Sequence, residues 1–214
     1  MAIAKLKREL SVNIYIVALV ITVVIFCLGI YVGMVIDESA KANVDTELRT
    51  LEQDLYLSRI MLLMEDNTTS FCPIYSEKLE SVNEQRQLIG DRLEYLETVR
   101  GVYDEEMKER YFYLELENYL LMDKMSKECG GEFVPVLFFY ERGAQTSLDQ
   151  GEILNQLRAA HPEVKVFSFD GNMDTAVVSV LEEKYLVSSY PSVVFNGTRL
   201  VGFQSLEQLE KKLQ

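Results

Sequence analysis

Three cysteines and one histidine are the residues of this 214-residue chain whose side chains most readily carry thiol or imidazole chemistry. They are too few for a usual multi-ligand zinc site, so we expect no metal and no other cofactor. Cys27 lies in a long apolar stretch, where a cysteine behaves as a small apolar residue. His161 precedes Pro162 without evident triad partners and is interpreted as an exposed loop residue. These residue types therefore predict no catalytic group by themselves.

Cys72 and Cys129 bracket two expected helices, and an antiparallel hairpin of those helices would bring both cysteines to the same end. A disulfide between them would persist in an oxidising compartment. Closing a loop of about 57 residues would stabilise the fold by roughly 4 kcal/mol in the chain-entropy model. We predict a structural disulfide, and the alternative is a redox-active or free pair.

Residues 14–36 are expected to span a membrane, because they contain no charged side chain. A helix of about 23 residues is roughly 35 Å long, enough to cross a hydrocarbon core of about 30 Å. Basic residues precede the segment and acidic residues follow it. The positive-inside rule then places residues 1–13 in the cytoplasm as a short tail and the remainder outside the cell membrane. The alternative is a signal peptide cleaved near residues 40–42, although its apolar region would usually be shorter.

The same segment holds Gly29 and Gly33 in a G-x-x-x-G arrangement, which lets two membrane helices approach closely. The expected partners are therefore membrane lipid through residues 14–36 and a second copy of the chain through these glycines. Two N-x-T sequons, at Asn67 and Asn196, lie on the expected outer side and are candidate glycosylation sites. The net charge of −13 disfavours nucleic acid as a partner.

Residues 37–131 are expected to be helical, because this region is poor in proline and glycine. The helices should cover about 43–64, 75–99 and 103–127. The first carries a short coiled-coil seam, and the tyrosine-rich third helix should form a hairpin with the second that packs on a neighbouring domain. The seam residues are Val44, Leu48, Leu51, Leu55 and Leu62 with Ser58 in the remaining slot, and the apolar side of the second helix consists of Leu79, Val82, Leu88, Leu93, Leu96 and Val99.

Residues 132–214 are expected to form an α/β domain in the order β-α-β-α-β-β-α. Short apolar runs predict strands at 134–140 and 164–169, with helices at about 148–160 and 174–185. Strands at 192–195 and 199–203 flank the hairpin turn signal Asn196-Gly197, and Ser205 should cap a last helix at 206–213. The first two strands should be parallel with a right-handed connection.

The segment Tyr190–Phe195 (Y-P-S-V-V-F), followed by Gly197 and Gly202-Phe203, resembles the cis-proline segment of thioredoxins. The resemblance covers about residues 133–214 and implies that the bond before the proline is cis. The whole layout is similar to uncharacterised archaeal membrane-anchored thioredoxin-like proteins, in which a strand ending Phe-Tyr is followed by C-P-x-C at the start of a helix. The matching tetrad here is Ser147-Leu148-Asp149-Gln150, which lacks both cysteines.

Thiol–disulfide exchange needs an attacking thiolate and a second thiol that resolves the mixed disulfide. A serine and a glutamine at those two positions supply neither, so the tetrad predicts no enzyme activity of this kind. Ser147 is instead expected to cap the helix, and Asp149 to favour its positive end.

The resemblance still implies a groove between the cis-proline loop and the former active-site loop, which in relatives holds extended polypeptide. We predict a redox-inactive, extracytoplasmic module that binds a polypeptide client or a protein partner. The alternatives are an oxidoreductase that uses Cys72 and Cys129, or a purely structural subunit of a membrane complex. The expected groove residues are Ala144, Gln145, Thr146, Ser147, Ser189, Tyr190 and Pro191.

Overall fold

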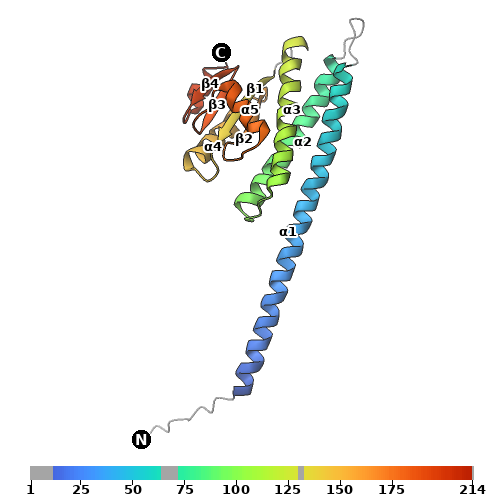
Figure 1. The fold of residues 1–214 in the computed structure, drawn as a ribbon, viewed down its shortest axis with the longest axis vertical. Coiled ribbons are helices and arrows are strands. Elements are labelled where there is room, and N and C mark those ends of the chain that lie inside the picture. Colours follow the sequence, from blue (N-terminus) through green and yellow to red (C-terminus); the bar gives the residue numbers. More distant parts are fainter. Residues whose placement is uncertain (1–11, 64–71, 130–132, 214) are drawn as a thin grey trace. The chain divides into compact units, whose positions relative to one another are not determined.

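The computed structural model describes residues 12–63, 72–129 and 133–213, and the chain divides into two compact units, Met1–Asn43 and Val44–Gln214. It is a mixed α/β chain with a long apolar N-terminal helix and a four-stranded sheet in the second unit (Figure 1). The expected domain boundary before residue 132 falls at residues 130–132, which lie outside the described residues.

Helix α1 covers Val12–Leu63 and contains no proline that would interrupt it. The side chains of its apolar stretch are exposed within the chain. Among the residues described, α1 is the one helix long and apolar enough to cross a membrane, and a signal sequence would meet the same two criteria. The expected span, residues 14–36, lies inside α1.

In the second unit, the last part of α1 packs with α2 (Cys72–Thr98) and α3 (Glu105–Cys129). The expected seam on α1 is buried from Val44 to Ser58, while the side chain of Leu62 lies outside the described residues. Ion pairs flank this seam on both sides. They join Asp54 to Lys78, Glu47 to Arg92, Asp45 and Glu52 to Arg110, and Arg59 to Glu117. The seam is thus covered by the chain's own helices, with α2 antiparallel and α3 parallel to α1.

The buried side of α2 differs from the expected one. Leu88 and Val99 are 57% and 66% exposed, so the prediction that they face inward is wrong. Asn83, Arg86 and Ile89 are buried in their place. The inward face keeps the helical spacing of three and four residues, but two of its positions are polar. An assignment based on apolar residues alone therefore misses the true face.

Helix α3 carries its aromatic side chains mainly inward, as the expected hairpin packing requires. Tyr111, Phe112 and Tyr119 are buried, whereas Tyr113 is 47% exposed. The carboxylate of Asp104 accepts the backbone N–H of Met107 at 3.1 Å and so caps the first turn. The N-terminus of α3 is therefore fixed directly after the glycine-containing turn that ends α2.

The sheet contains β1 (Val134–Tyr140), β2 (Val164–Asp170), β3 (Ser192–Phe195) and β4 (Thr198–Val201) in the order β2-β1-β3-β4. β1 and β2 are parallel and are joined through α4 (Gln145–Ala160), while β3 is antiparallel to β1 and β4. Helix α5 (Ala176–Tyr185) precedes β3, and α6 (Leu206–Glu210) follows β4. The expected order of elements is confirmed, as is the Ser205 cap of the last helix, where Gln208 completes a capping box.

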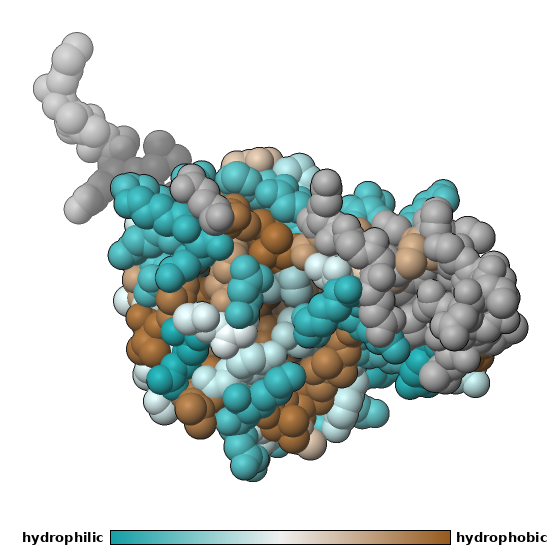
Figure 2. All heavy atoms as spheres, turned by 90° about the horizontal axis from the view of Figure 1, so that it is seen from above, coloured by the Kyte–Doolittle hydropathy of each residue, from teal (hydrophilic) through white to brown (hydrophobic). Residues whose placement is uncertain are grey.

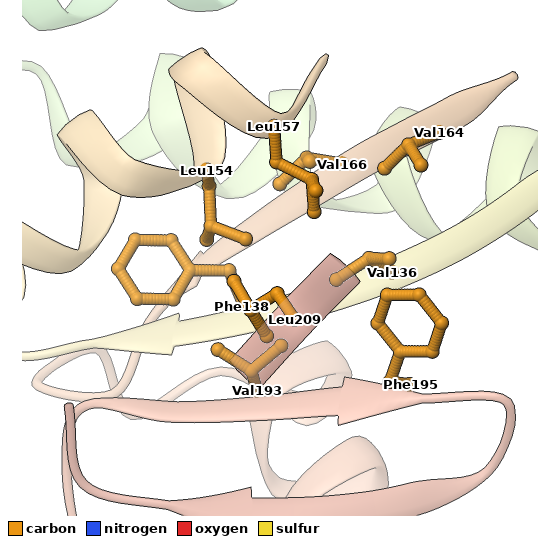
Figure 3. Close-up of a cluster of buried hydrophobic side chains, with 9 residues drawn as sticks. All are labelled: Val136, Phe138, Leu154, Leu157, Val164, Val166, Val193, Phe195 and Leu209. Carbon is orange, nitrogen blue, oxygen red and sulfur yellow. The ribbon is translucent and has the colours of Figure 1, made fainter. Parts of the chain in front are cut away.

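The two faces of the sheet are covered by different helices. Alternate residues of β1, β2 and β3 point to α4 and α6, where they form the cluster shown in Figure 3. On the other face α3 lies against β1, β2 and α5. There the ring of Phe112 packs on Phe169 with 5.4 Å between centroids, and the Tyr119 and Tyr185 hydroxyls are 2.6 Å apart. Helix α3 is therefore part of the core of the sheet rather than a separate spacer.

Outside the apolar stretch of α1, exposed apolar side chains are interspersed with polar ones. On the face shown in Figure 2, apolar side chains are separated by hydrophilic ones. Such scattered apolar residues are normal on a folded protein and need no partner to cover them.

Candidate functional site

The residues of the predicted groove lie at one end of the sheet. The register pairs Phe139, near the end of β1, with Ser192 at the start of β3. The loop that follows β1 and the loop that precedes β3 therefore emerge at the same end. The bond between Tyr190 and Pro191 is cis, as expected, and the carbonyl of Pro191 accepts the backbone N–H of Gly202 at 2.8 Å. Ser189 is exposed and Pro191 is buried.

The start of α4 differs from the expectation in register. The N-cap residue is Ala144, so the tetrad that opens the helix is Ala144–Ser147 rather than Ser147–Gln150. The prediction that Ser147 caps the helix is wrong, because this buried side chain lies inside the first turn. Its hydroxyl accepts the backbone N–H of Glu141 at 3.0 Å and holds the preceding loop against the helix. Gln145 and Thr146 are exposed beside it.

Gln150 is fully buried and links α4 to the segment after β4. Its Oε1 accepts the backbone N–H of Gln204 at 2.6 Å, and its Nε2 donates to the carbonyl of Gln204 at 3.3 Å. This pairing joins residues far apart in the sequence, so no local sequence pattern indicates it. Neither tetrad contains a cysteine, and Ser147 and Gln150 are both engaged in structural hydrogen bonds.

The side chain of Tyr190 is held in place by contacts with other residues of the chain. Its hydroxyl bonds to the carboxylate of Glu182 and lies 3.2 Å from the carbonyl oxygen of Gly171. A Cβ atom added at Gly171 would stand 2.0 Å from the Tyr190 ring, so the ring occupies the space of a side chain there. Desolvation and the neighbouring carboxylate of Glu182 raise the pKa of this phenol well above its ordinary value. In contrast, the backbone N–H and C=O of Tyr190 make no hydrogen bond within the described residues.

A pocket that the sequence did not indicate lies beside β2, the edge strand of the sheet. It has a volume of about 270 Å³ and is lined by α2 and α3 on one side and by β1, β2 and α4 on the other. Gly90 of α2 and Gly151 of α4 are among its lining residues, and at Gly90 the Tyr111 hydroxyl takes the space of a side chain, 2.5 Å from where a Cβ would stand. A Cβ at Gly151 would make only an ordinary contact, 3.9 Å from Phe138, so a side chain there would extend into free space.

A buried network of Arg86, Tyr111 and Glu115 forms one wall of this pocket. Arg86 Nη1 donates to Glu115 Oε1 at 2.7 Å, and the exposed fractions of the two side chains are 4% and 1%. The hydroxyl of Tyr111 bonds to the same carboxylate oxygen. Burial raises the pKa of Glu115, although Arg86 opposes the shift, and the pKa of the Tyr111 phenol is raised by burial and by Glu115. Asn83 accepts from Arg86 and completes the network.

A second set of charges ties α3 to the end of β2. Lys108 Nζ lies 2.6 Å from Glu97 and 3.4 Å from the fully buried carboxylate of Asp170. Arg142 approaches Asp170 at 3.8 Å and stacks over the ring of Tyr103, 4.2 Å from its centroid. These partners balance the charge of Asp170, which explains how a carboxylate is tolerated with no exposure.

His161 is better partnered than expected. Its Nδ1 lies 3.2 Å from Glu163 and its Nε2 lies 3.7 Å from Glu210, with about a third of the side chain exposed. His161 lies in the loop after α4, as expected, but it is partly buried rather than exposed and has carboxylate partners. Two carboxylates on opposite sides of the ring indicate a structural role for His161 that joins α4 to α6.

The remaining predicted sites are only partly covered by the described residues. Cys72 begins α2 and Cys129 ends α3, but the side chain of Cys129 lies outside the described residues, so their disulfide stays a prediction. Asn67 also lies outside them. Asn196 is exposed in the β3–β4 turn with a φ of 48°, which an asparagine tolerates. Within the described ranges, no group of three His, Cys, Asp or Glu side chains is placed to hold a metal ion.

No protein-family model matches this chain, and no curated protein matches it. One solved structure, described as that of a malarial protein, is 22% identical and aligns with 38% of this chain and 93% of its own, with a TM-score of 0.32. Chloroplastic thioredoxin z is 16% identical over 43% of this chain and 85% of its own, with a TM-score of 0.34. The likeness to a thioredoxin is weak, and neither neighbour is an archaeal protein, so these two lend the archaeal resemblance no support.

Proposed function

We propose that this protein is a membrane-anchored, thioredoxin-like module that binds an extended polypeptide and carries out no thiol chemistry. The observation that carries the proposal is the unpaired backbone of Tyr190, at the same end of the sheet as the start of α4. Free N–H and C=O groups next to a strand are what an extended peptide uses when it adds to a sheet. The order of elements and the strand order β2-β1-β3-β4 support the thioredoxin-like assignment.

The binding would be non-covalent, because the start of α4 offers no thiol. A thiol at a helix N-terminus is activated by the adjacent backbone N–H groups, whereas the N-cap position here is Ala144. Ser147 is buried and bonded to the backbone of Glu141. We therefore assign the two loops to recognition of the polypeptide backbone.

The apolar stretch of α1 would anchor this module with the second unit outside the cell membrane. Its length supports a membrane span, and the basic residues before it support a cytoplasmic N-terminus. The open glycines Gly29 and Gly33 would allow a homodimer, because a Cβ at either would meet no atom within 4 Å.

Changing Gly171 to alanine should weaken peptide binding without unfolding the protein. The new Cβ would displace the end of the Tyr190 ring and disturb the loop that carries the free backbone groups. We expect binding of a fluorescently labelled, permanently unfolded polypeptide by the full chain in detergent micelles to weaken about tenfold, equivalent to about 1.4 kcal/mol. Tyr190→Ala combined with Pro191→Ala should have at least this effect.

The matched control is Val180→Ala, an exposed position on α5 that should leave binding unchanged. Circular dichroism would confirm that each variant is folded. Unchanged binding in both loop variants would overturn the proposed groove and favour a structural subunit.

Cysteine mapping should show Cys72 joined to Cys129 and Cys27 as a free thiol. The physical reason is that the two outer cysteines begin and end the α2–α3 hairpin, whereas Cys27 is free in the structure. Native membranes would be alkylated without reduction and digested for mass spectrometry. An alkylated Cys72, or a mixed disulfide to another protein, would instead support a redox function at this pair.

A further inference from the structure

The pocket beside β2 carries more acidic than basic side chains. Three of its four basic side chains are engaged with carboxylates or a ring, and the fourth, Arg158, donates to Asn155. Arg86 is paired with Glu115, and Lys108 with Glu97. Arg142 is stacked on a tyrosine ring and lies near Asp170. Asp91 and Glu94 of α2 also line the pocket, and the side-chain carboxylate of Glu94 has no hydrogen bond or ion pair within the described residues, whereas its backbone carbonyl accepts the Thr98 hydroxyl. The acceptor groups of the pocket thus exceed its available donors.

The strongest sign of a missing donor is the carboxylate of Glu115. Its Oε1 receives bonds from both Arg86 and Tyr111, whereas its buried Oε2 has no partner. A buried carboxylate oxygen without a donor is costly and unusual. The residue lines the pocket, but the oxygen itself is buried, so a ligand donor would satisfy it after a shift of the neighbouring side chains.

The acidic side chains are arranged in a way that suits an organic cation rather than a metal ion. Asp91, Glu94 and Glu97 follow one another along α2 at intervals of three residues, and no described group of carboxylates converges on one point. Desolvation and the like charges of Asp91 and Glu97 raise the pKa of Glu94, so a positive group there would relieve the repulsion. The floor of the pocket includes the apolar side chains of Phe112, Phe138 and Leu154.

We propose that this pocket binds a small aliphatic diamine. One ammonium would pair with the carboxylates of Asp91 and Glu94, the other would donate to Glu115 Oε2, and the carbon chain between them would lie on Phe138 and Leu154. This site is separate from the polypeptide groove and does not depend on it.

The test is calorimetric titration of the full chain in detergent micelles with 1,4-diaminobutane. We expect saturable one-site binding, and a thermal midpoint that rises with ligand concentration because only the folded state binds. Glu94→Gln should weaken the affinity about tenfold. Gly151→Leu should abolish binding, because the new side chain would extend into the pocket from a position where its Cβ fits. Glu183→Gln, an exposed carboxylate on α5, is the matched control and should leave the affinity unchanged.

Three results would overturn the proposal. The first is the absence of saturable diamine binding. The second is equal binding in the wild type, Glu94→Gln and Gly151→Leu, which would indicate general attraction to an acidic protein. The third is saturable binding of succinate instead, which would assign the pocket to an anion held by Arg158, a lining guanidinium that donates to Asn155. Should Gly151→Leu fail to fold, the proposal is decided by the ratio of the diamine affinities of the Glu94→Gln and Glu183→Gln variants.

Discussion

Replacing Arg86 with methionine is expected to destabilise the full chain by about 3–5 kcal/mol, because it leaves Glu115 as an uncompensated buried charge. Arg86 supplies the carboxylate with a 2.7 Å hydrogen bond, and its guanidinium lies 4.6 Å from the centroid of the Phe167 ring. Methionine fills a similar volume but donates nothing. Burial already disfavours the charged form of Glu115, as the raised pKa of its carboxyl group indicates.

Urea unfolding of the full chain in micelles, followed by far-ultraviolet circular dichroism, would measure this loss. The double variant Arg86→Met with Glu115→Leu should recover most of it, because removing both charges removes the desolvation cost. Tyr111 would keep its contact with the backbone carbonyl of Arg86 at 3.3 Å. The control Arg49→Met removes an exposed pair with Asp45 and should cost less than about 1 kcal/mol. Equal effects of Arg86→Met and Arg49→Met would mean that the buried pair is not formed.

Phe112→Ala is expected to produce the second large effect, a loss of about 3–5 kcal/mol in the free energy of unfolding. The ring of Phe112 is fully buried and packs against Phe169 of β2, so its removal leaves a cavity between α3 and the sheet. The neighbouring position gives a matched control. Tyr113 is 47% exposed, and Tyr113→Ala should cost no more than about 0.5 kcal/mol, as is usual for surface positions.

The same unfolding assay would compare the two variants. A small effect of Phe112→Ala would show that α3 is a spacer that contributes little to the core. A large effect, in a single transition, would show that the helical hairpin and the sheet unfold together as one unit.

The strands could be predicted well because their signals are local. The apolar run 134–140 and the Asn196-Gly197 turn place β1 and the β3–β4 hairpin almost where the structure has them. Such runs bury both faces of a strand, so composition alone identifies them. The cis bond before Pro191 was likewise indicated by a recognisable segment.

The candidate sites could not be predicted in the same way. Apolar periodicity located the buried face of α1. On α2 it assigned the exposed Leu88 to the buried face and missed the buried Arg86. A charged residue is buried only when a partner from another helix meets it, and Glu115 lies on α3. The start of α4 was misplaced for a different reason, because Ala144 gives no capping signal. The long-range partner on α3, absent from any local pattern, decides the buried face of α2.

The contact between Tyr190 and Gly171 makes the choice of residue at one position depend on the other. The tyrosine ring occupies the volume that a side chain at position 171 would need, and Glu182 holds the ring there through its hydroxyl. Relatives with an aromatic residue at position 190 should therefore keep glycine at 171, while relatives with a small residue at 190 are free to carry alanine or serine there. A paired change at these two positions would be neutral where either single change is harmful, so the two sites should covary through evolution.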